Sequence, residues 1–391
     1  MSAVGDFRGS ERADSLVNTV VSTERLELRP WRADDVPRLV EIMADEAMHE
    51  FLALPRPYDA DAARQFIGEL AAPARENGTG LPCALVERSS GRVVGSALLR
   101  LGQEPEVGYW VAGDAQGRGY ATEATAALTA WGFERGLARV TLLCEVHNLA
   151  SARVALAAGF RFEGVSRDGF VGGGYGDVPE RRGDLARFAR LAGDPAGRIA
   201  PAFPALGDDE LSDGVLSLRP ERAEDAEVLV ECEDELTTRW NFTGAAKTPA
   251  ELAAATRRAG LDWLVGTAAQ FVMVDVATGR VAGGLQLRKA GPPQVGGVGY
   301  VVHPAFRGRG YTSRALRLLA GWAFDVADFA RLELGAKVGN VASWRAAASA
   351  GWPEEGLRQT RLRNADGTFT DERRYALLNP KYARAAPTPP A

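Results

Sequence analysis

The chain has 391 residues, of which 46% are hydrophobic and 25% charged, and its formal net charge is −5. At about 150 residues per domain, this length predicts two or three domains, and the ordinary composition excludes a chain that is disordered or collagen-like throughout. The negative charge argues against non-specific nucleic-acid binding, which needs a basic surface. No apolar run reaches the roughly 18 residues that predict a membrane-spanning helix.

The cysteines and the N-terminus indicate the compartment. Three cysteines, an odd number, are scattered along the chain and predict neither a disulfide framework nor a metal site. Residues 1–19 lack the apolar core of a secretory signal. We therefore expect a cytoplasmic protein without a bound metal or a membrane partner.

The most informative feature is an internal repeat with a period of about 190 residues, far longer than the roughly 20–50 residues of a solenoid repeat. Three motifs occur once in each half, in the same order: Leu-Arg-Pro at 28–30 and 218–220, Val-Gly-Tyr at 107–109 and 298–300, and Asn-X-Ala-Ser at 148–151 and 340–343. Such a period indicates two copies of a whole domain.

The composition sets the expected domain limits. Residues 192–213 are rich in Pro, Gly and Asp and predict a linker between domains at 22–191 and 214–383. The ends of the chain, residues 1–21 and 384–391, are expected to be disordered.

Each half predicts an α/β fold of the α+β type, with a mixed, mostly antiparallel sheet flanked by helices. In the first half a strand at 26–29 precedes a helix that Asp34 or Asp35 can cap. The later elements, in chain order, are a hairpin at 82–87 and 93–101, a strand at 106–112, a helix after a Gly-rich turn, a strand at 140–146, a helix at 151–158 and strands at 160–165 and 182–188.

The Gly-rich turn follows a strand and begins a helix in both halves. The N–H groups at a helix start have no partner within the helix, and with the helix dipole they form a site for phosphate oxygens. Glycines allow positive φ and a close approach of the backbone. The turn residues are Gln116, Gly117, Arg118, Gly119, Tyr120 and Ala121, and in the second half Arg307, Gly308, Arg309, Gly310, Tyr311 and Thr312.

Three nucleotide-binding interpretations of this turn compete. A P-loop is excluded because Tyr120, and not Lys, follows Gly119. A dinucleotide-binding turn lacks its third glycine, and here the turn follows an antiparallel hairpin. A pyrophosphate loop of the Q/R-x-x-G-x-G/A type fits with one residue fewer before the glycine pair. A turn that serves only backbone geometry is the alternative, and its repetition in both halves favours the pyrophosphate loop.

Residues 106–124, followed by 148–151 and by Ala-Gly-Phe at 158–160, resemble the GNAT N-acetyltransferases. The opening at 23–31 resembles their RimJ/RimL-like branch, the ribosomal-protein-alanine N-acetyltransferases. The resemblance covers nearly all of each domain. It implies acetyl-CoA as donor, CoA as product and a primary amine as acceptor. It also implies that the pantetheine arm lies between the fourth and fifth strands, which splay apart, and pairs with the fourth strand.

Transfer of an acetyl group to an amine requires a base, because an alkylammonium has no lone pair. Glu106, at the start of the strand at 106–112, is the candidate base, and an exposed carboxylate in a surface ladder is the alternative. The second half has Gly297 at this position, which puts base catalysis there in doubt. His303, aligned with Ala112, fits a spacer at the strand end better than a replacement base.

Further residues are assigned through the resemblance. Asn148 and Asn340 precede short helices and are predicted N-caps, and the resemblance implies that they also bind pantetheine. Ser151 is a candidate proton donor to the thiolate, and Ser343 is its counterpart. The implied oxyanion and cofactor contacts of the fourth strand are the backbones of Trp110, Val111, Val301 and Val302.

The acceptor pocket is less defined. Its aromatic candidates, each of which can equally belong to the core, are Trp31, Phe51, Tyr58, Phe170, Tyr175, Trp240, Phe242 and Trp263. The loop at 169–177 can cover an acceptor. A small-molecule amine and a peptide or protein N-terminus both remain possible, and the lack of a basic patch for ribosome binding favours the small molecule.

Two function classes remain. The first is an acetyltransferase whose first domain is catalytic, the second acting on another amine or serving as a scaffold. The other is a non-catalytic acyl-CoA-binding or regulatory protein. Because fused repeats can bury a dimer face within one chain, either a monomer or a homodimer is expected.

Overall fold

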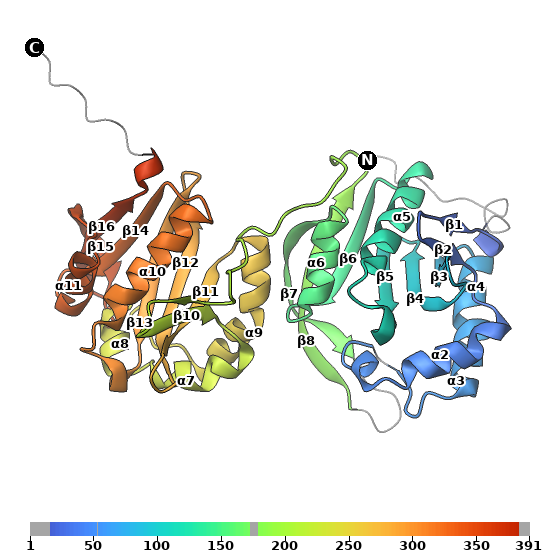
Figure 1. The fold of residues 1–391 in the computed structure, drawn as a ribbon, viewed down its shortest axis with the longest axis horizontal. Helices are drawn as coiled ribbons and strands as arrows, with labels where there is room; N and C mark the ends of the chain where they lie inside the picture. The colour runs from blue at the N-terminus through green and yellow to red at the C-terminus, as the bar shows by residue number, and fades with distance from the viewer. Residues whose placement is uncertain (1–15, 53, 173–178, 383–391) are drawn as a thin grey trace, which may run out of the picture. The chain divides into compact units, whose positions relative to one another are not determined.

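The computed structural model describes residues 16–52, 54–172 and 179–382, which form two compact units divided between Ala200 and Pro201 (Figure 1). Each unit contains one eight-stranded sheet. Within the described ranges, no helix has both the length and the apolar character needed to cross a membrane.

In the first unit the sheet order is β1-β2-β3-β4-β5-β6-β8-β7, and β5 and β6 are the parallel pair. The strands are β1 (Val21–Ser22), β2 (Leu26–Arg29), β3 (Gly80–Glu87), β4 (Val93–Arg100), β5 (Glu106–Val111), β6 (Arg139–Glu145), β7 (Arg161–Gly172) and β8 (Arg181–Leu191). The helices are α2 (Val36–Met43), α3 (Ala60–Gln65), α4 (Ala72–Glu76), α5 (Tyr120–Glu134) and α6 (Leu149–Ala157). The π-helical segment η3 (Phe66–Ala71) joins α3 to α4, and η1 (Ala33–Asp35), η2 (Glu46–His49) and η4 (Gly113–Ala115) are short 3-10 helices.

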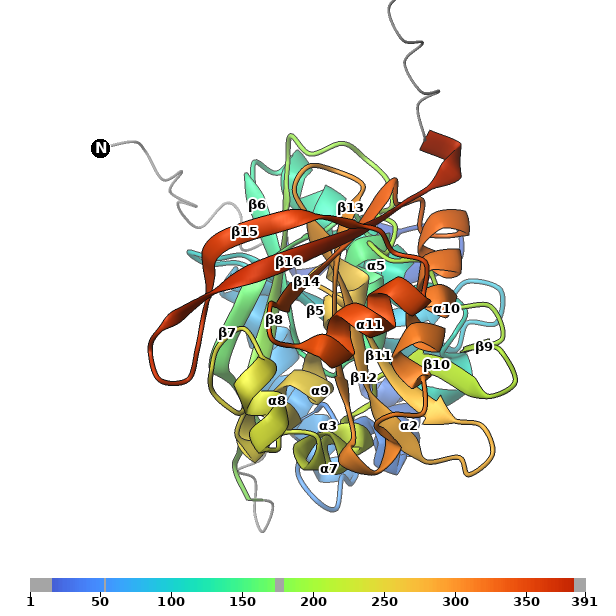
Figure 2. The same ribbon diagram turned by 90° about the vertical axis from the view of Figure 1, so that its left-hand side faces the viewer.

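The second unit repeats this topology. Its order is β15-β16-β14-β13-β12-β11-β10-β9, with β13 and β14 parallel, and Figure 2 shows β15 and β16 as a long hairpin. The strands are β9 (Leu211–Ser212), β10 (Leu216–Pro220), β11 (Ala269–Asp275), β12 (Val281–Ala290), β13 (Val295–Val302), β14 (Arg331–Lys337), β15 (Glu354–Arg363) and β16 (Phe369–Leu378). The helices are α7 (Ala226–Glu231), α8 (Glu235–Trp240), α9 (Pro249–Val265), α10 (Tyr311–Asp325) and α11 (Val341–Ser349), with short turns η5 (Ala223–Asp225), η6 (Pro304–Phe306) and η7 (Pro380–Tyr382). Two tandem domains with mixed, mostly antiparallel sheets are thus confirmed.

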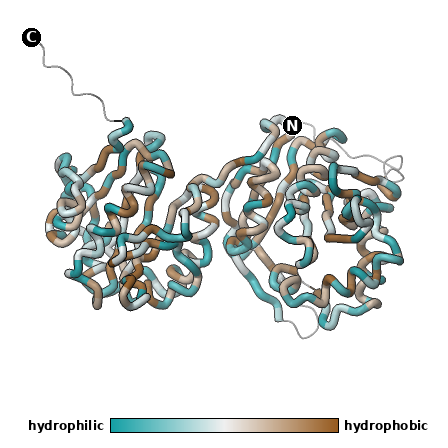
Figure 3. Tube along the Cα trace, in the orientation of Figure 1, coloured by the Kyte–Doolittle hydropathy of each residue, from teal (hydrophilic) through white to brown (hydrophobic). Residues whose placement is uncertain are grey.

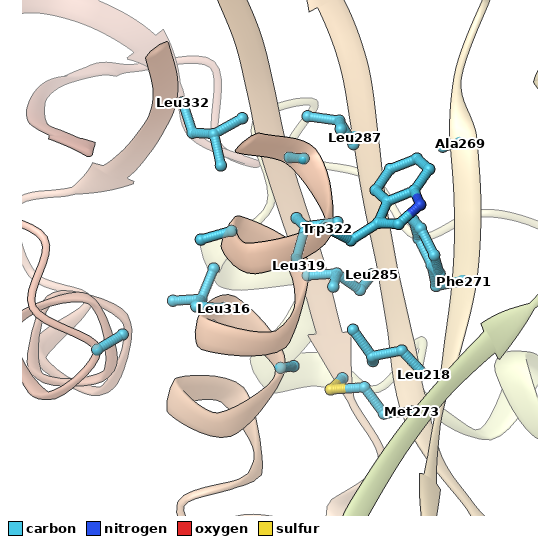
Figure 4. Packing of buried hydrophobic residues seen from close by; sticks show 14 of the residues in the cluster. Leu218, Ala269, Phe271, Met273, Leu285, Leu287, Leu316, Leu319, Trp322 and Leu332 are labelled. Carbon is cyan, nitrogen blue, oxygen red and sulfur yellow. The ribbon is translucent and has the colours of Figure 1, made fainter. Parts of the chain in front are cut away.

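The helix after each Gly-rich turn packs its apolar side against the sheet. In α10, Trp322 is 4% exposed, and its ring centroid lies 5.6 Å from that of Phe271 on β11 (Figure 4). In α5, the predicted inner residues Ala124, Leu128 and Trp131 are likewise buried. Figure 3 shows the hydrophobic stretches along the central strands of each unit.

The predicted linker is shorter than its composition indicated. Phe203 is 1% exposed and lies in the core of the second unit with Leu206. Residues 211–212 form β9, which pairs with β10. Burial of the side chains at 203 and 206 removes apolar surface from water, which stabilises this segment in the core although Pro, Gly and Asp surround it. The second unit therefore begins near Pro201.

The N-terminal segment is also more ordered than predicted. Leu16 is buried, and Val21 belongs to β1. Arg75 holds this segment, because its buried guanidinium donates to the carbonyl oxygens of Leu16 and Thr19 at 2.7 and 3.0 Å. Disorder from residue 16 to 21 is therefore wrong, while residues 1–15 and 383–391 lie outside the described residues.

A buried ion pair ties the start of each helical layer to the sheet. Arg29 of β2 binds Asp35 through two hydrogen bonds of 2.8 Å, and Asp35 also accepts the N–H of Arg32. Arg219 and Asp225 repeat the pair in the second unit. The carboxylate of Asp35 is thus occupied by Arg29 and Arg32 and makes no capping bond to α2, contrary to the cap that the sequence allowed.

We expect Asp35→Ala to destabilise the first unit by about 3–5 kcal/mol, because it leaves Arg29 buried without its counter-charge. Asp34→Ala, at the exposed neighbouring position, should change stability by less than about 0.5 kcal/mol. Denaturant-dependent hydrogen exchange of β2 and β3 in the full chain measures both. Equal losses in the two variants would contradict the assignment.

Candidate functional site

Helix α5 begins without a side-chain cap. Its N-cap residue, Gly119, has a left-handed φ of 81°, and Gly117 has a φ of 73°. The first bond of the helix runs from the N–H of Glu123 to the carbonyl of Gly119, so the N–H groups of residues 120–122 have no helical partner. Helix α10 begins in the same way at Gly310, with a φ of 75°.

Several other helices begin with a side-chain cap, whereas α2, α4 and α7 continue directly from the short helical segments η1, η3 and η5. Side-chain oxygens accept a backbone N–H at the starts of α6, α8, α9 and α11, from Asn148, Asp234, Thr248 and Asn340 respectively. The uncapped starts of α5 and α10 therefore leave donors at the positive end of a helix, where an anion is stabilised.

The first side chain of each turn supports the end of the preceding strand. Gln116 donates to the carbonyl oxygen of Val111 at 3.2 Å, and Arg307 donates to that of Val302 at 3.3 Å. Arg307 also binds Asp234 through two hydrogen bonds of 2.6 and 2.9 Å, which hold the pKa of that carboxyl well below its usual range. The predicted ligand Arg307 is thus already neutralised by a partner.

The two turn tyrosines are anchors. Tyr120 and Tyr311 are buried, and their hydroxyls donate to Glu87 and Asp275 respectively. Only their backbone N–H groups face the open helix start. The guanidinium groups of Arg118 and Arg309, which lie between the two glycines of each turn, are more exposed. They are 3.9 and 4.0 Å from the carboxylates of Glu87 and Asp275, and about half of each side chain is open to solvent beside the open amides.

In each unit the sheet opens between its two parallel strands, β5 and β6 or β13 and β14. We call this opening the fork. In the first unit the pairing of β5 with β6 consists of Glu106 with Thr141 among the described residues. In the second unit β13 pairs with β14 as far as Val298 with Leu334. Beyond these points the edges of β5 and β13 that face the fork have no strand partner in the described part of the chain. Their backbone N–H and C=O groups are therefore available to another extended chain. The predicted contacts Trp110, Val111, Val301 and Val302 all lie in these unpaired stretches.

A hydroxyl pair lies beside each fork. The Tyr109 hydroxyl is 2.9 Å from Oγ of Ser151, and that of Tyr300 is 2.6 Å from Oγ of Ser343. Burial raises the pKa of Tyr300 to about 12, so this hydroxyl remains protonated at neutral pH. Neither tyrosine is among the site residues predicted from the sequence, although both belong to the repeated Val-Gly-Tyr motif.

The two asparagines are N-caps, as predicted. Oδ1 of Asn148 accepts the N–H of Ser151 at 3.0 Å, and Oδ1 of Asn340 accepts that of Ser343 at 3.2 Å. Neither Nδ2 group has a hydrogen-bond partner in the part of the chain that the structure describes. These amide groups can donate to a ligand in the fork.

Glu106 lies on the opposite face of β5 from Tyr109. Its carboxylate pairs with Arg100 at 3.2 Å and keeps 27% of its side chain exposed. Trp110 shares its face, since alternate residues of a strand do so. The ring centroid of Trp110 is 6.1 Å from that of Trp31, which lies 5.6 Å from Phe66. An aromatic cluster therefore occupies the face that carries the candidate base.

The same face is polar in the second unit. Glu221 replaces Trp31, and strand register places it in one row with Gln270, Gln286 and Gly299. The amide of Gln286 lies close over Gly299, because a Cβ added there would be 3.0 Å from its Nε2. The two units thus carry different side chains on this face of the sheet.

His303 is a spacer at the strand end. Its Nδ1 accepts the N–H of Ala305 at 3.1 Å, and its Nε2 therefore carries the proton and donates to Glu231 at 2.8 Å. Both ring nitrogens are occupied, so the residue is not placed to act as a replacement base.

The remaining pocket candidates separate into groups. Trp263 is a core residue, 9% exposed and with its ring centroid 5.0 Å from that of Phe271, so the core alternative holds for this residue. Tyr175 and the centre of the loop at 169–177 lie outside the described residues. The others have different surroundings. Phe51 contacts His147, and Arg181 covers Phe170 of β7. Burial raises the pKa of Tyr58 to about 12, Arg239 covers Trp240, and Phe242 is exposed.

The comparisons with known proteins agree with this architecture. A family model described as acetyltransferase (GNAT) domain matches residues 25–161 and 216–352. A Bacillus subtilis (strain 168) protein named Probable N-acetyltransferase YjcK is 31% identical over 90 residues, covering 23% of this chain and 49% of the relative. Uncharacterized N-acetyltransferase YoaA, from the same strain, is 26% identical over 153 residues, covering 38% of this chain and 86% of the relative.

Among solved structures, Mycobacterium smegmatis RimJ in complex with CoA-disulfide is 21% identical and has a TM-score of 0.41. The match covers 48% of this chain and 93% of that one. The chain spans about half the length of YjcK, because the match covers 49% of that relative.

The polar row of the second unit predicts a pH-dependent stability. Burial, and next the neighbouring Asp225, raise the pKa of Glu221 from 4.5 to about 7; Asp262 acts in the same direction, and Lys247 and Arg219 oppose it. The folded state therefore binds more protons than the unfolded state between these pH values, and stability falls as the pH rises through this window.

We expect Glu221→Gln to stabilise the second unit by about 1–3 kcal/mol at pH 8 and to have almost no effect at pH 4.5 or below. Melting temperatures measured between pH 4 and 8 test this. Glu224→Gln, at an exposed position nearby, is the matched control and should show no such pH dependence. A gain that is the same at every pH would contradict the prediction.

Proposed function

Because the chain belongs to the GNAT acetyltransferase family, we propose that it is an N-acetyltransferase that acts on a primary amine, with the first unit catalytic. The family's acetyl donor is acetyl-CoA, and solved relatives hold CoA or acetyl-CoA. The observation that carries the proposal is the position of Glu106, whose partly exposed carboxylate lies on the strand that borders the open fork.

The residues of the first unit suit this donor. The open amides at the start of α5 and the guanidinium of Arg118 suit a diphosphate, and the unpaired edge of β5 suits the amide groups of a pantetheine arm. Nδ2 of Asn148 supplies one further donor. When bound, acetyl-CoA supplies an acetyl thioester that is already activated for transfer.

The protein's own groups then divide the proton transfers. Glu106 accepts a proton from the incoming ammonium, directly or through a water. The backbone N–H of Trp110 or Val111 stabilises the negative charge that develops on the carbonyl oxygen. Ser151, hydrogen-bonded to Tyr109, donates a proton to the departing thiolate. Placing the amine beside the thioester contributes the rest.

The acceptor is a small-molecule amine or the N-terminus of a peptide or protein. The cluster of Trp31, Phe66 and Trp110 favours an acceptor with an apolar group near its amine. The three buried cysteines are free thiols, as suits a cytoplasmic enzyme. A non-catalytic acyl-CoA-binding protein is the second candidate, favoured by the glycine at position 297 of the second unit.

The donor site predicts the effect of a charge at the helix start. We expect wild-type protein to bind CoA at two sites by calorimetry, and Gly119→Asp to weaken one of them by at least about tenfold through repulsion of the diphosphate. Gly119→Asn is the control, because Asn has the same size and also tolerates the left-handed backbone. Similar losses in both variants would assign the effect to backbone strain and remove the anion site.

The base predicts a second result. Glu106→Gln should leave acetyl-CoA affinity unchanged and lower kcat/KM for the amine by about 10²–10⁴-fold. Because a free amine needs no base, the loss should shrink as the pH approaches the amine's own pKa near 10. Glu104→Gln, at an exposed carboxylate two residues earlier, is the control. A kcat/KM for the amine that is unchanged in Glu106→Gln would remove Glu106 from the mechanism.

A further inference from the structure

The second unit has no side chain at the position of Glu106, and its fork is lined by glycines. Gly297 and Gly299 lie on β13, and Gly335 on β14 is the first residue beyond the last pair, Val298 with Leu334. Since alternate residues share a face, Gly335 lies on the same face as Gly297 and its partner Glu333. Neither Gly297 nor Gly335 therefore contributes a side chain to this face.

A carboxylate from the next strand covers this backbone. Glu372 of β16 lies over Gly335 so closely that any Cβ at 335 would collide with its Oε1. In the first unit the equivalent positions are Leu143 and Leu185, as the register of β6 with β8 shows. Both positions therefore differ between the units, and the glycine at 335 leaves the space that the side chain of Glu372 occupies.

One oxygen of Glu372 lacks a donor. The residue is 3% exposed, and its Oε1 accepts a hydrogen bond from Arg374 at 3.2 Å. Oε2 is buried without a hydrogen-bond partner among the described residues, and the guanidinium of Arg358 lies 3.8 Å from it, beyond hydrogen-bonding distance. A buried carboxylate oxygen in this state is costly unless a ligand supplies the donor.

The neighbouring charged residues Glu333 and Lys337 are already bonded to other groups of the protein. Both oxygens of Glu333 are occupied, by Arg331 at 2.7 Å and by Arg374. The ammonium of Lys337, 1% exposed, donates to the carbonyl of Arg239 at 3.1 Å. Glu372 is thus the acid at this fork with an oxygen left over for an N–H donor.

We infer that Glu372 receives the ammonium of the acceptor and acts as the base of the second unit, which makes this unit a second acetyltransferase site. The inference rests on the proposed function. One proton of the ammonium passes to Glu372 and on to solvent. The nitrogen lone pair then attacks the thioester carbonyl, forming the C–N bond, and the C–S bond breaks. The second proton also passes from the nitrogen to Glu372 and on to solvent. Ser343, which Tyr300 contacts, gives its hydroxyl proton to the thiolate and regains one from solvent. The products are an N-acetyl amide and CoA.

The test uses the full chain with Glu106→Gln, which removes the proposed base of the first unit. CoA release from acetyl-CoA is measured with spermidine, lysine methyl ester and an alanyl peptide. We expect residual turnover with at least one amine, and adding Glu372→Gln should lower it by at least about tenfold at neutral pH, less at high pH, without changing acetyl-CoA affinity at the second site. Glu354→Gln, an acid of β15 bound to Arg373, is the control and should leave the residual rate unchanged.

The outcomes separate the two claims. If the wild-type chain turns over but Glu106→Gln abolishes all activity, the second unit is silent and the inference is overturned. The inference is equally overturned if Glu372→Gln leaves the residual rate and its pH profile unchanged. If the wild-type chain itself releases no CoA with any amine, the proposed function fails first. Glu372→Asp, which keeps the charge, provides a second variant should the glutamine variant not bind acetyl-CoA.

Discussion

The opening between the two parallel strands of each sheet is the constraint on which the other features of the site depend. The strands remain in place because each has a full antiparallel partner on its other side: β4 beside β5, and β8 beside β6. The core therefore tolerates an edge of unpaired backbone inside the sheet. The glycine-started helix follows the first strand of the fork, and the asparagine-capped helix follows the second, so both arrive beside the same gap.

The two units agree at the helix starts and caps beside the opening and differ on the opposite face of the sheet. The uncapped helix starts, the Asn caps and the Tyr–Ser pairs occur in both units with the same partners. The opposite face has changed: Trp31 corresponds to Glu221, Glu106 to Gly297 and Leu185 to Glu372. This distribution is expected if both units take the same donor and present it to different acceptors.

Local features of the sequence predicted the fold, the glycine-started helices and the Asn caps well, because a glycine pair, an N-cap or an apolar helix side depends on neighbouring residues. The failures involve partners far apart in the chain. Leu16 is held by Arg75, Phe203 enters a core built mainly by later strands, and Tyr109 meets a serine 42 residues on. Composition showed a linker and a loose terminus in two of these places, because burial depends on what packs against a residue as well as on its own polarity.

If Glu372 is the base of the second unit, the absence of a side chain at the position of Glu106 does not by itself mean that activity is lost. Adjacent strands lie about 4.8 Å apart, so a glutamate on the neighbouring strand can place its carboxylate over the backbone of the strand beside it when that strand carries glycine. Gly335 provides this space, and a leucine there, as in the first unit, would deny it. A carboxylate on the neighbouring strand can therefore lie on the same face of the sheet as the one it would replace. The face on which a side chain lies depends on its position in the alternation along its strand, not on the identity of one residue. An alignment of the halves position by position finds only the glycine at 297, whereas the register of β14 with β16 brings the acid back to the fork.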